Sequence, residues 1–124
     1  LLGIRTQSDL LLHPKVGASW EGYALEEVLS ATEPDEAYFW GTHNGAELDL
    51  LLLKNGKHIG VEFKRMDAPR LTSSMRIALN DLALEHIFVI YPGSRSYPLS
   101  EQVTVMPLNQ LNQGGQLLGN PAGT

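Results

Sequence analysis

The sequence feature that most limits the possible folds of this chain is an Asn-Gly dipeptide between two apolar runs. The runs are ELDLLLL at 47–53 and HIGVEFK at 58–64, and a short KNGK linker joins them. Asn55 and Gly56 both tolerate the positive φ that a type I′ turn requires. The segment is therefore predicted to be a β-hairpin with a two-residue turn, in which residues equally far from the turn face each other.

The register of this hairpin brings acidic residues together. Counting from the turn, Asp49 faces Glu62, and Glu47 faces Lys64 on the next rung. Because side chains alternate along a strand, Asp49 and Glu62 are expected on one face with their Cβ atoms roughly 5 Å apart. Opposed carboxylates repel each other, so this pair is expected to hold a cation. The apolar side chains are assigned to the opposite face: Leu48, Leu50, Leu52, Ile59, Val61 and Phe63.

Carboxylate oxygens suit a hard divalent ion, so Mg²⁺, or Mn²⁺ in its place, is the predicted cofactor, and none is expected to be required for folding. Asp49 and Glu62 are predicted to be direct ligands, together with the main-chain carbonyl of Phe63. Lys64 would orient an attacking water or offset developing negative charge. Two simpler interpretations stay open: Asp49 and Glu62 are an edge pair relieved by Lys64 and solvent, or Lys64 merely neutralises Glu47 across the rung.

A third carboxylate comes from the helix predicted at 16–30, which follows Pro14. Helical spacing places Glu21 on the apolar face of this helix, with Gly17, Ala24, Leu25 and Val28. A buried carboxylate needs a cation, a donor or a metal, so Glu21 is predicted to complete the site directly or through water. The alternative is a salt bridge from Glu21 to Lys64 or Lys15.

The remaining pattern predicts an α/β domain with a mixed central sheet flanked by helices. A second helix is expected at 71–84, with Thr72 and Ser73 as candidate caps. Strands are expected at 37–41, 47–53, 58–64, 86–91 and, as an edge strand, 102–108. Residues 1–108 are interpreted as one domain, since 124 residues with 43% hydrophobic content suffice for a single core. Residues 109–124 are rich in Asn, Gln and Gly and are predicted to be a disordered tail.

Composition and charge exclude several classes of protein. Cysteine is absent, which rules out disulfides, thiolate zinc sites and cysteine nucleophiles, and the four histidines lack zinc-site spacing. No apolar run suits a membrane span or a signal peptide, so a cytoplasmic protein is expected. The net charge of −5 disfavours a sequence-wide surface for polyanions. Arg65, Arg70 and Arg76 either contact phosphates locally or form a solvated basic face, and Trp20 and Trp40 are interpreted as packing aromatics.

The spacing Gly17-x-x-x-Glu21, Glu47-x-Asp49 and Glu62-x-Lys64, on a helix and two strands, resembles the PD-(D/E)XK nuclease superfamily, including archaeal-type Holliday junction resolvases. One departure is that leucine, not proline, precedes the aspartate. More closely, several longer segments are similar to the uncharacterised domain that ends many prokaryotic AAA-type ATPases. Those segments are LLGI, HPKVGASWEG, ELDLLL, GVEFK, LTSSMRIALNDL, VIYPG and VMPL, and they span most of residues 1–108.

This resemblance implies a restriction-endonuclease-like αβββαβ core, with the superfamily's acidic positions at Glu21, Asp49 and Glu62 and its lysine at Lys64. It also implies an amino-terminal P-loop ATPase and a winged-helix region as partner domains in a longer parent chain, although these residues contain no ATP-binding motif. The first hypothesis is metal-dependent hydrolysis of DNA or RNA. The second is a non-catalytic module of the same fold that binds nucleic acid, a partner protein or the ATPase's own domains, and a structural dimerisation domain is the third.

Overall fold

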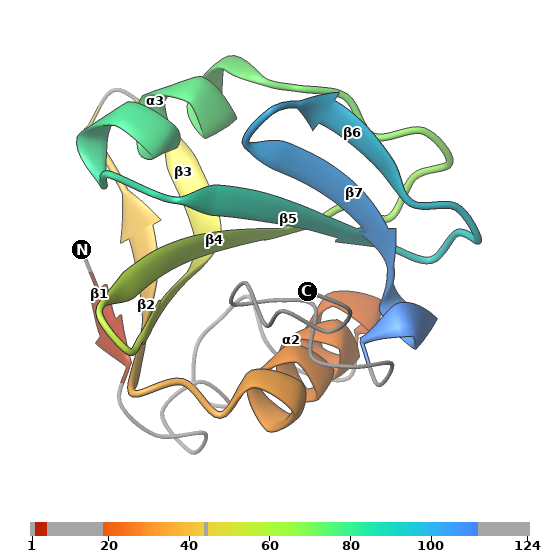
Figure 1. Cartoon of the computed structure of the whole chain (residues 1–124), viewed down its shortest axis with the longest axis horizontal. Helices are drawn as coiled ribbons and strands as arrows, with labels where there is room; N and C mark the ends of the chain where they lie inside the picture. Colours follow the sequence, from red (N-terminus) through yellow and green to blue (C-terminus); the bar gives the residue numbers. More distant parts are fainter. Residues whose placement is uncertain (1, 5–18, 44, 112–124) are drawn as a thin grey trace.

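A seven-stranded mixed β-sheet lies between two helices in the computed structural model, which describes residues 2–4, 19–43 and 45–111 (Figure 1). The strands are β1 (Leu2–Ile4), β2 (Glu36–Gly41), β3 (Glu47–Lys54), β4 (Lys57–Phe63), β5 (His86–Tyr91), β6 (Tyr97–Ser100) and β7 (Val103–Pro107). The helices in the described residues are α2 (Trp20–Thr32) and α3 (Ser73–Asp81), and a short 3₁₀ helix, η1 (Leu108–Gln110), follows β7. The predicted mixed α/β architecture is confirmed.

The order across the sheet is β1-β2-β3-β4-β5-β7-β6. The neighbours β4, β5 and β7 are parallel, whereas all other neighbouring strands are antiparallel. Because strands of one direction end at the same edge, the carboxyl ends of β4, β5 and β7 lie side by side. This edge is where the candidate site is found.

The predicted order of helix, three strands, helix and strand is confirmed from α2 to β5. Both helices begin with a side-chain cap: Ser19 accepts a hydrogen bond from an N–H in the first turn of α2, and the predicted cap Thr72 does the same for α3. Such caps satisfy N–H groups that have no partner inside the helix. α2 ends where Glu33 adopts a left-handed conformation with φ 45°. The predicted start of the first helix, at 16–18, lies outside the described residues.

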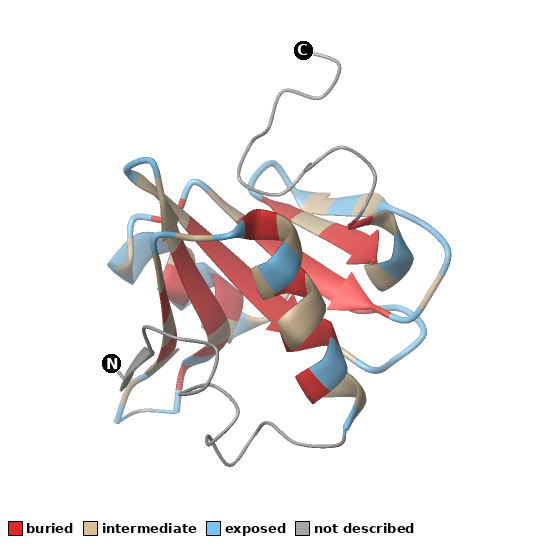
Figure 2. Ribbon diagram, turned by 90° about the horizontal axis from the view of Figure 1, so that it is seen from below, coloured by how far each residue is buried: buried red, intermediate tan, exposed pale blue. Residues whose placement is uncertain are grey.

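The two helices cover opposite faces of the sheet, so the apolar side chains form two clusters (Figure 1). The α2-side core contains Ala24, Leu25, Val28, Ala37, Phe39, Leu50, Leu52, Ile59, Val61, Phe63, Phe88, Ile90, Met106 and Leu111. The α3-side core contains Leu48, Leu51, Met75, Ala78, Leu84, Ile87, Val89, Tyr91, Val103 and Val105. Figure 2 shows the buried residues concentrated in the strands between the helices. Neither helix of the described residues has the length and apolar character that crossing a membrane demands.

The carboxyl-terminal strands differ from the prediction. β7 pairs with β5 on one side and with β6 on the other, so the interpretation of 102–108 as an edge strand is wrong. β6 is the edge strand, and it escapes prediction because it has only four residues and contains Pro98. Proline is tolerated there because an edge strand has N–H groups that need no ladder partner. β1 pairs with β2 at the other edge and also goes beyond the sequence prediction.

The packed structure continues past residue 108. Residues Leu108–Gln110 form η1, and Leu111 is buried in the α2-side core. The segment predicted as a tail therefore begins with residues that pack against the domain. Residues 112–124 lie outside the described part of the chain.

Candidate functional site

The predicted register of the hairpin is confirmed between β3 and β4. Backbone pairing runs without a shift from the turn to Leu50, which lies opposite Val61. The two turn residues have φ values of 52° and 79°, the positive values that a type I′ turn requires. The same count places Asp49 opposite Glu62, one position beyond the last backbone pair.

Asp49 and Glu62 replace the next backbone pair with two hydrogen bonds between side chain and main chain. The N–H of Asp49 donates to Oε2 of Glu62 at 2.7 Å, and the N–H of Phe63 donates to Oδ2 of Asp49 at 2.9 Å. Each carboxylate thus has one oxygen fixed by an N–H group of the opposite strand. The predicted proximity of the two acids is confirmed, and they meet where the ladder of β3 and β4 ends.

A β-bulge in β3 lies at the same place. Tyr38 of β2 is opposite Leu51, whereas Trp40 is opposite Leu48, so β3 carries one extra residue in the stretch that includes Asp49. One extra residue reverses the alternation of faces, and Leu48 packs in the α3-side core. The prediction that Leu48 shares a face with the leucines of the α2-side core is therefore wrong. Bulges of this kind re-aim side chains and occur often beside active sites.

Glu62 is buried, with 6% of its surface exposed. Burial raises the pKa of Glu62 from 4.5 to about 7, and the carboxylate of Asp49 raises it as well. The hydrogen bond from the Asp49 N–H and the charge of Lys64 lower this pKa, but by less. Near neutral pH the Glu62 carboxyl is therefore protonated in about half of the molecules, and a cation at the same place would displace that proton.

Lys64 follows β4 directly and brings a cation to the acidic pair. Its Nζ lies 3.6 Å from Oε1 of Glu62, and its side chain is 35% exposed. Its main-chain N–H donates to the carbonyl of Ile90 at 2.9 Å, which extends the pairing of β4 with β5 to the edge of the sheet. The predicted lysine thus lies next to the predicted acids, on a main chain that the sheet holds in place, with its ammonium group partly in solvent.

Glu21 lies in the first turn of α2 and is half-buried. α2 covers the face of the sheet to which Val61 and Phe63 belong, and Glu62 alternates with these two and is directed to the other face. Glu21 and Glu62 therefore belong to opposite sides of the sheet. Among the described residues, no three His, Asp or Glu gather closely enough to hold one metal ion. The roles of Glu21 and of the Phe63 carbonyl stay predictions.

The three predicted phosphate contacts are all exposed. Arg65 and Arg70 lie in the loop that leads from Lys64 to α3, and Arg76 lies on α3. Exposed guanidinium groups are able to meet phosphate oxygens without loss of buried contacts. Their role in nucleic-acid binding stays a prediction.

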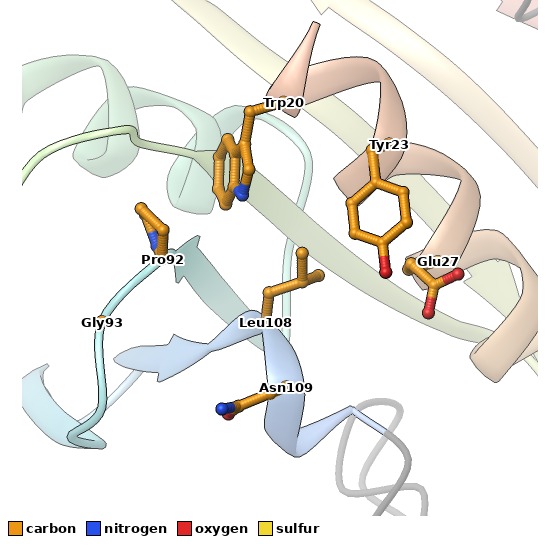
Figure 3. Close-up of a pocket in the computed structure, with 7 residues that line it drawn as sticks. All are labelled: Trp20, Tyr23, Glu27, Pro92, Gly93, Leu108 and Asn109. Atoms are coloured by element: carbon orange, nitrogen blue, oxygen red, sulfur yellow. The ribbon is translucent and has the colours of Figure 1, made fainter.

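A pocket of about 340 Å³ lies between α2 and the segments that follow β5 and β7 (Figure 3). Trp20, Tyr23 and Glu27 form its α2 wall, because their spacing of three and four residues puts them on one helical face. Pro92 and Gly93 after β5 and Leu108 and Asn109 after β7 complete the lining. The pocket therefore lies at the carboxyl ends of the parallel strands, along the same edge as Lys64.

Sequence reasoning misses most of this pocket for a topological reason. The shared helical face of Trp20, Tyr23 and Glu27 is visible in the sequence, but the residues opposite are far away along the chain. Residues 92–93 and 108–109 meet only because β5 and β7 are parallel neighbours. Trp20 also packs against the α2-side core, as expected of a packing aromatic.

Comparison with known proteins gives a family match and two similar proteins. The profile of the family described as "Domain of unknown function (DUF4143)" matches residues 16–111. The chain is 41% identical over 117 residues to the uncharacterized protein Rv2008c of Mycobacterium tuberculosis, and equally to the uncharacterized protein Mb2031c of Mycobacterium bovis. The aligned part is 94% of this chain and 26% of each relative, so the chain spans about a quarter of their length. No solved structure matches the chain.

Proposed function

The chain belongs to the DUF4143 family, and we propose that it is a PD-(D/E)XK nuclease-like domain that hydrolyses phosphodiester bonds in nucleic acid with a divalent metal ion. The observation that carries this proposal is the Asp49/Glu62 pair, held by reciprocal hydrogen bonds where β3 and β4 separate, with Lys64 beside it. Acid on one strand, acid on the next and lysine two residues later is the arrangement that the resemblance implies.

The donor set fits a hard divalent cation. Two carboxylates converge from neighbouring strands, and burial together with the charge of Asp49 raises the pKa of Glu62 more than the N–H donor and Lys64 lower it. Asp49 and Glu62 would hold the ion, with the Phe63 carbonyl as a further proposed donor, whereas Glu21 belongs to the other side of the sheet. When bound, Mg²⁺ or Mn²⁺ would activate water and stabilise negative charge on the phosphodiester.

The protein's own groups would orient the reaction. The N–H groups of Asp49 and Phe63 fix one oxygen of each carboxylate, so the orientation of the pair is set before substrate binds. Lys64, with its ammonium group partly in solvent, would reach a phosphate oxygen and offset the negative charge that develops there. Burial of Glu62 keeps bulk water from its carboxylate and strengthens the charge interactions of this group.

The fold supports the proposal. α2, β2, β3, β4, α3 and β5 follow the αβββαβ order of a restriction-endonuclease-like core, and β7 and β6 would extend its sheet. The relatives are much longer than the aligned part, which leaves room in them for other domains. The proposal therefore includes an AAA-type ATPase and a winged-helix region as partner domains.

The direct test is metal-dependent cleavage. Wild-type protein is incubated with Mn²⁺ or Mg²⁺ and labelled DNA or RNA, in single-stranded, duplex and branched forms. Asp49→Asn and Lys64→Ala are expected to lower the cleavage rate by about 10²-fold or more, because each removes charge stabilisation at the reacting phosphate. Asp81→Asn, an exposed acid at the end of α3, and Lys57→Ala, at the opposite end of β4, are matched controls that should cut normally. Metal-stimulated cutting that survives Asp49→Asn and Lys64→Ala would contradict the proposal.

A second candidate function is a non-catalytic binding module of the same fold. The observation that favours it is that Asp49 and Glu62 are already compensated by N–H donors and by Lys64. Under this alternative the acidic pair is a structural clasp between β3 and β4. Calorimetry with Mn²⁺ separates the two functions, because a clasp predicts no binding and a metal site predicts binding that Asp49→Asn abolishes.

A further inference from the structure

The pocket beside α2 shares an edge of the sheet with the acidic pair. Glu62 and Lys64 lie at the carboxyl end of β4, and the pocket lies at the carboxyl ends of β5 and β7. β4 and β5 are parallel neighbours, and the hydrogen bond from the Lys64 N–H to Ile90 ties the end of one to the end of the other. A ligand that crosses this edge would therefore pass from the acidic pair, where Glu62 is directed to the α3 side, to the pocket on the α2 side.

The lining of the pocket suits a flat, neutral ring. Figure 3 shows the Trp20 and Tyr23 rings from α2 with Leu108 between the walls and Pro92 across from Trp20. The Tyr23 hydroxyl, the Glu27 carboxylate and the Asn109 amide supply polar groups at the rim. Aromatic and apolar walls with a few polar groups are typical of small-molecule sites, and a volume of about 340 Å³ is of their size.

The charges decide which part of a nucleic acid the pocket would take. Within the part of the chain that the structure describes, no lysine or arginine lines it, and Glu27 would repel a phosphate group. A base has a face that stacks on Trp20 or Tyr23 and donor groups that a carboxylate and an amide accept. Tyr23 is 56% exposed, so its ring is open to an incoming partner.

We propose that this pocket binds one unstacked nucleobase of the strand whose backbone lies at Asp49, Glu62 and Lys64. This inference rests on the proposed function and deepens it by naming the substrate class. A base inside a duplex is stacked and paired, and only an unpaired base is free to enter. The preferred substrate is therefore a single strand, or the single-stranded part of a branched nucleic acid.

The test separates base binding from backbone binding. Binding of a fluorescently labelled 12-nucleotide single-stranded DNA is measured in EDTA, where no cutting occurs, and compared with a strand of equal length that has no bases. Wild type is expected to prefer the complete strand by roughly 5- to 100-fold, the range that stacking of a base gives. Tyr23→Ala should bring the ratio close to one. Ile77→Ala removes a similarly exposed apolar side chain from α3, on the other face of the sheet, and should keep the ratio.

A second readout needs no substitution in the pocket. Trp40→Phe leaves Trp20 as the single tryptophan, and its fluorescence should change with the complete strand and not with the base-free strand. Equal binding of the two strands by wild type, absence of binding to both, or an unchanged ratio in Tyr23→Ala would overturn the proposal. Metal-dependent cutting is measured separately in the same preparations. Cutting without a base preference refutes only the proposal that the pocket binds a base. A base preference without cutting refutes only the proposed nuclease activity.

Discussion

The two ends of the β3/β4 hairpin follow different rules. At the turn end, Asn55 and Gly56 adopt the positive φ that a two-residue turn requires, and the backbone pairs are regular. At the acidic end, the backbone pairs stop, β3 contains a bulge, and Asp49 and Glu62 take the N–H groups of the opposite strand. One pair of strands is therefore locally ideal at one end and irregular at the other.

The difference teaches where stability and function conflict. At the turn end, Asn55 and Gly56 suit the positive φ values that they adopt. The acidic end buries Glu62 beside Asp49, an arrangement in which a neutral side chain would stabilise the fold more. Local conflicts of this kind concentrate at functional sites. The comparison predicts that the effect of a substitution at Glu62 depends on pH and that of a substitution in the Asn55-Gly56 turn does not.

The largest expected effect is a gain of stability in Glu62→Gln. The pKa of Glu62 is about 7 in the folded protein against 4.5 as its ordinary value, so the folded protein keeps a proton that the unfolded chain releases. Wild type therefore loses stability as pH rises from about 4.5 to about 7, by on the order of 2 to 3 kcal/mol. Glu62→Gln should be more stable than wild type by that amount near pH 8 and equal to it near pH 4. Urea unfolding without divalent metal measures the difference.

Glu85→Gln is the matched control for this substitution. Glu85 is exposed and lies just before β5, near the turn end of the sheet. Glu85→Gln should change the free energy of unfolding by less than about 0.5 kcal/mol at any pH. If Glu62→Gln gives the same difference from wild type at low and high pH, burial of a charge is not what distinguishes the acidic end.

Gly93→Ala should destabilise the protein by about 2 kcal/mol, because overpacking forces neighbouring atoms apart. A Cβ at this position would lie 2.2 Å from Cε2 of the Tyr91 ring, which is buried. The Tyr91 hydroxyl donates to the carbonyl of Arg95 and accepts its N–H, so neither the ring nor the loop can move freely. Gly41→Ala, whose Cβ would meet ordinary contacts, is the control. Thermal unfolding compares the two, and equal midpoints would show that the pocket wall is not tightly packed.

The sequence predicts the turn end almost completely and the acidic end only in part. The register depends on Asn55, Gly56 and strict alternation, which are local properties. The face of Leu48 depends on a bulge that arises from pairing with β2, so alternation along β3 alone gives the wrong answer. The repulsion between Asp49 and Glu62 is visible in the sequence, whereas the burial that raises the Glu62 pKa needs the whole sheet.

The remaining errors have a similar cause. The position of β7 inside the sheet depends on β6, a short strand that Pro98 hides from pattern recognition. The pocket depends in turn on β7 lying parallel to β5. Features that one segment determines were therefore predictable, and features that need several distant segments were not.

Gly56→Ala should destabilise the protein by about 1 kcal/mol, because a side chain is strained at the φ of 79° that this glycine adopts. No Cβ clash contributes, since the space around this position is open. The cost should be the same near pH 4 and near pH 8, in contrast to Glu62→Gln. Urea unfolding at both pH values checks this. A cost that changes with pH would mean that the two ends of the hairpin are coupled.

The smallest expected effect concerns His86, at the amino end of β5 and thus at the turn end of the sheet. His86 is half-buried, its Nε2 is hydrogen-bonded to Oγ1 of Thr104 at 2.8 Å, and burial lowers its pKa from 6.5. The unfolded chain therefore binds a proton more readily, and the protein loses stability as pH falls below about 6.5. The contribution of Glu62 to the pH dependence of stability has the opposite sign. The two contributions therefore offset each other in the wild-type protein, and that of His86 is not visible there.

In Glu62→Gln protein the His86 slope should become visible as a modest loss of stability from about pH 6.5 downwards. Adding His86→Gln should remove that slope, whereas adding His43→Gln, at an exposed position in the turn between β2 and β3, should leave it. Urea unfolding of the three proteins between about pH 5 and pH 7 makes the measurement. A slope that persists without His86 would mean that another group of the turn end titrates in this range, and the two ends would then differ less than their geometry implies.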